Sequence, residues 1–151
     1  MSTTLRKFFN LLRRPLRDKI LVAQTYLLLG FSRLAIRLLS MHRLTRFFGP
    51  QNVETAEEAP PEQLREARRI AWAISSVSPY TPWNSNCYPQ AITAKYLLRR
   101  RRIPCTLYLG AAFKKEKEEG LEAHAWLRCG PIYVTGGKGH KQFGTVGIFG
   151  L

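Results

Sequence analysis

The chain changes its hydrophobic pattern once, near residue 103, and this change limits the folds open to it. Before that point apolar residues recur at helical spacing, and after it they fall in short strand-like segments separated by turn residues. Helices followed by strands are typical of an α+β domain with an antiparallel sheet. We expect helices over 3–13, 16–40, 42–48, 62–77 and 87–102, and strands over 105–113, 121–129, 132–135 and 142–149. The helix over 87–102 is apolar on almost every side, which predicts a central position against the sheet.

The first third of the chain is both basic and apolar. Residues 4–48 contain ten arginines and lysines and one acidic residue, Asp18, and the whole chain has a formal charge of +14. This balance favours an acidic partner or surface. Residues 49–61 have the composition of a linker. We therefore expect a basic amphipathic helical region (1–48), a linker (49–61) and the α+β domain (62–151).

The apolar run from Ile20 to Phe31 is shorter than the ~20 residues that cross a bilayer, and arginines follow it at once. No small-residue cleavage site follows the run either, which argues against a signal peptide. The helices of residues 4–48 are expected to pack on the domain, with peripheral contact with a membrane or docking of a partner as further roles.

Cys87 and His124 have the local settings that a cysteine nucleophile and its general base require. A turn-rich stretch, residues 78–86, ends at Cys87, and Asn86 suits the N-cap of the helix that starts there. A helix N-terminus carries partial positive charge and unpaired N–H groups, so it favours a thiolate and can stabilise an oxyanion. His124 lies in an expected strand, whose rigid backbone could aim the imidazole at the thiol. The pair predicts acyl transfer through a cysteine thioester.

Four donors are candidates for the oxyanion site. They are the backbone N–H of Cys87 and groups of Trp83, Asn84 and Asn86. The residues alone do not rank them.

The other two cysteines, Cys105 and Cys129, lie in apolar strand-like runs and are expected to be core residues. An odd number of cysteines without close pairing favours a reducing compartment. The chain has no Cys-x-x-Cys spacing, so a metal site is not predicted. The run Arg99–Arg102 lacks an accompanying nucleic-acid motif, so we expect a solvated helix end and no nucleic-acid partner. No cofactor is expected.

Four segments together resemble the lasso peptide biosynthesis B2 protein family. They are Trp83 to Ala91, Leu97 to Pro104, Ala123 to Leu127 and Val134 to Gly137. The resemblance covers residues 62–151 in detail and implies a papain- or transglutaminase-like cysteine peptidase core. It also implies that the protein removes the leader from a ribosomally made precursor peptide in the bacterial cytoplasm. A separate B1 leader-recognition protein would deliver that substrate, and an ATP-dependent cyclase would close the ring of the released core peptide.

One position departs from the family pattern. The family's third catalytic residue is typically an aspartate on the strand after the histidine, whereas the one aspartate of this chain is Asp18. Glu122, two residues before His124 and hence on the same strand face, is the substitute candidate, and a solvent-facing carboxylate is its alternative. Two other functions stay open. One is an acyltransferase or transglutaminase on the same core, and the other is a non-catalytic basic scaffold that binds a peptide.

Overall fold

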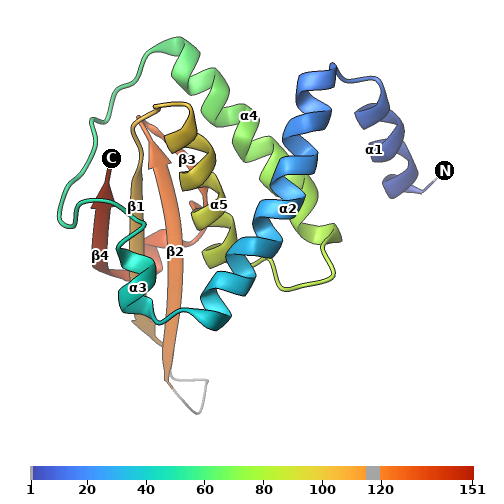
Figure 1. The fold of residues 1–151 in the computed structure, drawn as a ribbon. Helices are drawn as coiled ribbons and strands as arrows, with labels where there is room; N and C mark the ends of the chain where they lie inside the picture. The colour runs from blue at the N-terminus through green and yellow to red at the C-terminus, as the bar shows by residue number, and fades with distance from the viewer. Residues whose placement is uncertain (1, 115–119) are drawn as a thin grey trace.

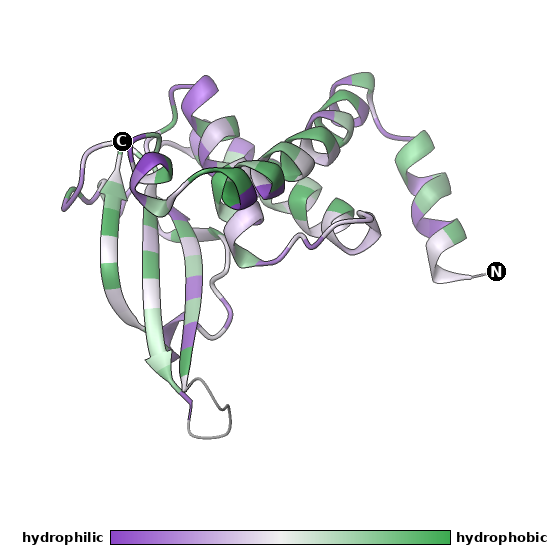
Figure 2. Ribbon diagram, turned by 60° about the horizontal axis from the view of Figure 1, so that its bottom comes forward, coloured by the Kyte–Doolittle hydropathy of each residue, from purple (hydrophilic) through white to green (hydrophobic). Residues whose placement is uncertain are grey.

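A computed structural model describes residues 2–114 and 120–151 and shows helices packed on one face of a four-stranded antiparallel sheet (Figures 1 and 2). The helices are α1 (Thr3–Leu12), α2 (Leu16–Leu38), α3 (Met41–Thr45), α4 (Pro61–Val77) and α5 (Cys87–Arg100). The strands are β1 (Thr106–Phe113), β2 (Leu121–Cys129), β3 (Ile132–Thr135) and β4 (Gly144–Gly150), in the order β3-β2-β1-β4. Short 3₁₀ turns lie at Ser78–Tyr80 (η1) and His140–Gln142 (η2). The expected α+β class is confirmed.

α5 packs against one face of the sheet, as the apolar pattern predicted. The pairing of β1 with β2 contains no register shift, so side chains along β2 alternate strictly between the two faces. Leu107, Ala125 and Leu127 are buried in one core together with Ala91 and Ala94 of α5. The odd-numbered residues of this part of β2 therefore face the helices, and the even-numbered ones face away from them.

The opposite face of the sheet is built around aromatic rings and one arginine. The rings of Tyr108 and Trp126 stack with centroids 5.5 Å apart and an interplanar angle of 8°. Arg128, a buried residue, donates to the Tyr108 hydroxyl at 3.2 Å and to the carbonyl oxygens of Thr55 and Ala56 at 2.8 and 3.1 Å. Its guanidinium thus ties a distant segment of the chain to this face.

That segment, residues 50–56, is called the strap below. It lies within the stretch whose composition predicts a linker, yet it pairs with the last strand. Gln51 forms a β-bridge with Phe149, the Asn52 N–H donates to Ile148 at 2.8 Å, and the Gly150 N–H donates to Pro50 at 3.2 Å. The strap is therefore an ordered part of the sheet.

The basic N-terminal region also contributes to the core. Leu21 of α2, Leu44 of α3 and Phe48 are buried in the same cluster as α4 and α5. α1 contributes no buried residue, and it projects away from the rest of the chain (Figure 1). The domain core consequently draws on residues from both sides of the strap.

Candidate active site

The loop that precedes Cys87 is held in place by hydrogen bonds. The Thr81 hydroxyl contacts the carbonyl oxygens of Ser78 and Trp83 at 3.1 and 3.0 Å, and it lies 2.7 Å from the Ser85 hydroxyl. At the other end, the Gln90 side-chain amide donates to the Ser85 carbonyl at 2.8 Å. The loop is thereby fixed to both η1 and the first turn of α5, so the start of the helix has a defined position.

Cys87 is the first residue of α5, which confirms the expected helix-start cysteine. Asn86 occupies the N-cap position, but its side chain makes no capping hydrogen bond. The first N–H groups of a helix have no partner within it, and no backbone acceptor for the N–H of Cys87 or Tyr88 is present among residues 2–114 and 120–151. These two donors point out of the helix end, where an oxyanion could accept from them.

The three thiols differ in accessibility. Cys87 is half-buried, whereas Cys105 and Cys129 are fully buried, as their apolar strands predicted. Burial raises the pKa of both of these interior thiols. Because a raised pKa disfavours the thiolate, Cys87 is the cysteine best placed for nucleophilic chemistry.

His124 lies on β2, in the predicted strand, and its ring is held on two sides. Its Nε2 donates to the Gly136 carbonyl at 2.8 Å, and the ring stacks on Phe143 and Trp126 with centroids 4.8 and 5.7 Å away. Since a carbonyl oxygen can only accept, the proton of the neutral imidazole is on Nε2 and the lone pair is on Nδ1. A free lone pair on a fixed ring is what a general base needs.

Gly136 can make this bond because of its backbone conformation. Its φ of +66° lies in the left-handed region that favours glycine, and a Cβ there would collide with the Ala125 carbonyl and the Trp126 backbone. Gly137 is also close-packed, because a Cβ there would lie 2.6 Å from the Cβ of Tyr133. The two consecutive glycines after a strand were the sequence signal for a tight turn here. The sequence alone did not show which carbonyl would accept the hydrogen bond from His124.

The structure gives Glu122 a different contact from the one expected. Glu122 is on the same face of β2 as His124, but its carboxylate forms an ion pair with Lys114, with Oε2 and Nζ 2.6 Å apart. The nitrogen that an orienting acidic residue would hold, Nε2 of His124, is bound to the Gly136 carbonyl. The role expected for Glu122 stays a prediction, and the group that holds Nε2 of His124 in this structure is the Gly136 carbonyl.

Cys87 and His124 are not joined in this structure. Cys87 shares a helix face with Ala91 and Ala94, which pack on the sheet, while His124 is on the face of β2 that carries Trp126, away from Ala125. No hydrogen bond between the thiol and the imidazole is present in the described part of the chain. The nucleophile and the base are thus each prepared but held apart.

The side-chain candidates for the oxyanion site lie in different settings. Trp83 packs its indole on α2, with its ring centroid 5.1 Å from that of Tyr26 and its edge against Gly30. Its Nε1 is buried without a hydrogen-bond partner among the described residues. Asn84 and Asn86 are exposed. The structure therefore favours the backbone donors of α5 over these three side chains.

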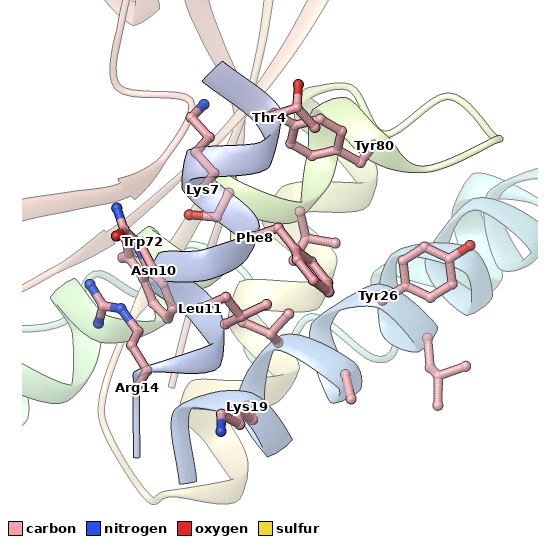
Figure 3. A pocket seen from close by; sticks show the side chains of 15 residues that line it. Thr4, Lys7, Phe8, Asn10, Leu11, Arg14, Lys19, Tyr26, Trp72 and Tyr80 are labelled. Carbon is pink, nitrogen blue, oxygen red and sulfur yellow. The ribbon is translucent and has the colours of Figure 1, made fainter. Parts of the chain in front are cut away.

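A groove of about 820 Å³ lies between α1, α2 and α4 (Figure 3), and neither Cys87 nor His124 lines it. Phe8, Tyr26 and Trp72 contribute rings to its walls, and Lys7 and Arg14 lie along it. It is linked to the loop before α5 by Tyr80 of η1, which also lines it, and by the ring contact of Tyr26 with Trp83.

Comparison with known proteins gives one match. A family model described as the transglutaminase-like superfamily matches residues 31–147. No curated protein and no solved structure matches the chain. No group of three or more His, Cys, Asp or Glu residues that could hold a metal ion occurs among residues 2–114 and 120–151.

Proposed function

The chain belongs to the transglutaminase-like superfamily, and from this premise we propose that it is a cysteine peptidase that removes the leader from a ribosomally made lasso precursor peptide. The superfamily supports a cysteine-dependent acyl-transfer core, and the four sequence segments that resemble B2 proteins supply the finer assignment. The observation that carries the proposal is the half-buried thiol of Cys87 at a helix N-terminus with two open N–H donors beside it.

The reaction uses two residues and water. Nδ1 of His124 takes the proton of the Cys87 thiol, and Sγ attacks the carbonyl carbon of the scissile peptide bond. The oxyanion accepts hydrogen bonds from the N–H groups of Cys87 and Tyr88. The imidazolium returns its proton to the leaving amine, the C–N bond breaks, and water then hydrolyses the thioester with His124 again as base.

The separation of thiol and imidazole places a requirement on this mechanism. Catalytic hydrogen bonds in unliganded enzymes are often long and close only in the substrate complex. Here, however, Cys87 and His124 lie toward opposite faces of the sheet, so the mechanism requires His124 and its part of β2 to rearrange toward the α5 side when the precursor binds, and the separate B1 protein that delivers the leader is the proposed source of the binding energy. The ATP-dependent cyclase acts afterwards on the released core peptide, in the cytoplasm.

Gly136 replaces an acidic residue as the group that orients the imidazole. A carbonyl fixes the tautomer, as an aspartate would, but it carries no full charge to stabilise the imidazolium. We therefore expect a slower reaction than in a triad with a carboxylate.

The test is cleavage of a precursor peptide by the full chain in the presence of the B1 protein, followed by mass spectrometry. Cys87→Ala should abolish release of the leader, and His124→Ala should lower it to a similar extent, while Cys129→Ala keeps it if the core tolerates the lost sulfur. Normal cleavage by Cys87→Ala, with its fold verified by circular dichroism, would refute the proposal.

Two alternatives give different products. An acyltransferase would resolve the thioester with an amine, so added hydroxylamine would appear in the product at the expense of hydrolysis. The separated thiol and imidazole favour a second alternative, a non-catalytic scaffold that binds the peptide. Such a scaffold would bind precursor with unchanged affinity after Cys87→Ala and would release no leader in any form.

A further inference from the structure

One face of α2 is an exposed apolar stripe that runs along the whole helix. We call it the α2 stripe, and its members are Leu16, Ile20, Leu27, Phe31, Leu34 and Leu38, each 49–71% exposed. At 3.6 residues per turn they fall within about 60° of the helix circumference, over a length of roughly 33 Å. Soluble proteins rarely expose an apolar surface of this length to water, so such a surface often marks an interaction site.

The opposite face of α2 is fixed inside the domain. Leu21, Thr25 and Leu29 are fully buried, and the Ser32 hydroxyl lies 3.1 Å from that of Thr93 on α5. By length and hydropathy α2 could cross a membrane, a capacity that the shorter apolar run expected from the sequence did not indicate. Because the face with these buried residues is packed inside the domain, the helix in this fold can lie on a membrane rather than cross it.

Basic side chains flank the stripe. On the helix circumference Lys19, Arg33 and Arg37 lie on one side of it and Arg17 lies on the other. The one acidic residue of this region, Asp18, is buried and paired with Arg69 at 2.6 Å. Arg17 pairs with Glu66 of α4, with Nη2 and Oε2 3.5 Å apart, so the net positive charge beside the stripe comes from Lys19, Arg33 and Arg37.

α1 extends the same kind of surface. Leu5, Phe8, Phe9 and Leu12 are each 45–56% exposed, and no residue of the helix is buried. Figure 2 shows hydrophobic residues recurring along both α1 and α2. Two helices thus present apolar residues outside the folded core.

We propose that α1 and the α2 stripe dock on an anionic lipid surface, such as the cytoplasmic face of a membrane. A helix that lies in the interface buries an apolar face among acyl chains while lysines and arginines at its flanks meet lipid phosphates. A protein partner would be expected to deplete lysine and to supply acidic residues at matched positions along some 33 Å. A bilayer covers a straight stripe of any length without such matching. The proposal does not depend on the peptidase assignment.

The test measures partition of the full chain onto vesicles of phosphatidylglycerol and phosphatidylcholine, compared with vesicles of phosphatidylcholine alone, by sedimentation. The double variant Leu27→Gln/Phe31→Gln should lower partition at least tenfold, since both side chains are exposed in the free protein and buried in the bound one. Arg33→Gln/Arg37→Gln should lower it about 25-fold on anionic vesicles, at about fivefold per cation. High salt should reproduce the second effect.

Two matched controls isolate the surface. Phe113→Gln/Val146→Gln removes two apolar side chains of the sheet that are even more exposed than Leu27 and Phe31, and it should change partition less than twofold. Cys87→Ala should bind vesicles like the wild type, which separates this result from the outcome for cleavage. Circular dichroism must show the wild-type fold for each variant.

Three results would overturn the proposal. They are no partition onto anionic vesicles at lipid excess, equal loss in the sheet control, and a concentration-dependent oligomer that Leu27→Gln/Phe31→Gln dissolves while vesicle binding is absent. The last result would assign the stripe to contact between copies of this chain.

Discussion

Replacing Arg69 by leucine should destabilise the domain, because this arginine joins α2 to α4 through buried charge. Its Nε donates to Asp18 at 2.6 Å, its Nη1 contacts both carboxylate oxygens of Glu66 at 3.0 and 3.2 Å, and its Nη2 donates to the Arg17 carbonyl at 2.8 Å. Arg69→Leu leaves Asp18 with one ion-pair partner, Arg14, whose side chain is 44% exposed. Glu66 retains Arg101, with Nε and Oε1 2.7 Å apart.

The size of the destabilisation depends on the ion-pair partners that Asp18 and Glu66 retain in Arg69→Leu. Removing one partner of a buried ion pair costs about 3–5 kcal/mol, and the remaining partners of both carboxylates reduce this to about 2–4 kcal/mol. For a chain of this size each kcal/mol lowers Tm by about 2–4 °C, so a fall of roughly 4–16 °C is expected. Urea unfolding followed by circular dichroism measures the difference, and Arg68→Leu, an exposed neighbour, should change stability by less than about 0.5 kcal/mol.

The loss should also depend on pH. The hydrogen bond from Arg69 is the main cause that holds the pKa of Asp18 below its usual 3.8, with Arg14 adding to it and burial opposing it. A carboxylate with a lowered folded-state pKa stabilises the fold above its unfolded value, and that stability disappears as pH falls below about 3.8. The gap between wild type and Arg69→Leu should therefore shrink between pH 7 and pH 3. A gap below about 1 kcal/mol at pH 7, or one of constant size down to pH 3, would refute this reasoning.

Iodoacetamide should label Cys87 at least about 100-fold faster than the two buried cysteines, because these react only after the structure opens. Peptide mass spectrometry over time measures the labelling rates. Faster labelling of either buried thiol would rule out Cys87 as the nucleophile. Gly136→Ala should lower the kcat of leader cleavage at least tenfold with a smaller effect on KM, since the new Cβ displaces the carbonyl that holds His124. Gly139→Ala is the matched control: its φ of +79° imposes a similar backbone strain but its Cβ meets open space, so equal kcat values for the two variants would show that strain, and not the carbonyl, is responsible.

The periodicity of apolar residues predicted the helices and strands well. The bounds of β2 and β3 and the start of α5 at Cys87 agree with the expectation, because apolar alternation and the turn-rich approach are local properties. α2 and α1 end one or two residues earlier than expected. Helix ends depend on caps more than on periodicity, which explains the difference.

The relations within the site could not be predicted in the same way. Whether His124 faces α5 depends on which side of the sheet the helices cover, and a single strand pattern does not fix that side when both faces are buried. The bond to Gly136 depends on a positive φ, and the order of the strap depends on a buried arginine 72 residues away from Ala56. The orientation of His124, its bond to Gly136 and the order of the strap are all determined by tertiary contacts.

The strap has a consequence for how this protein is made. Gln51 leaves the ribosome early, but its bridge partner Phe149 is synthesised about 100 residues later, which takes roughly 5–20 s at typical translation rates. During that interval the outer edge of β1 lacks β4, and the strap has neither the strand nor Arg128 to bind. The nascent chain therefore carries an open strand edge beside finished apolar helices, a combination that invites aggregation. Translation speed and chaperone supply are therefore expected to affect the yield of this protein.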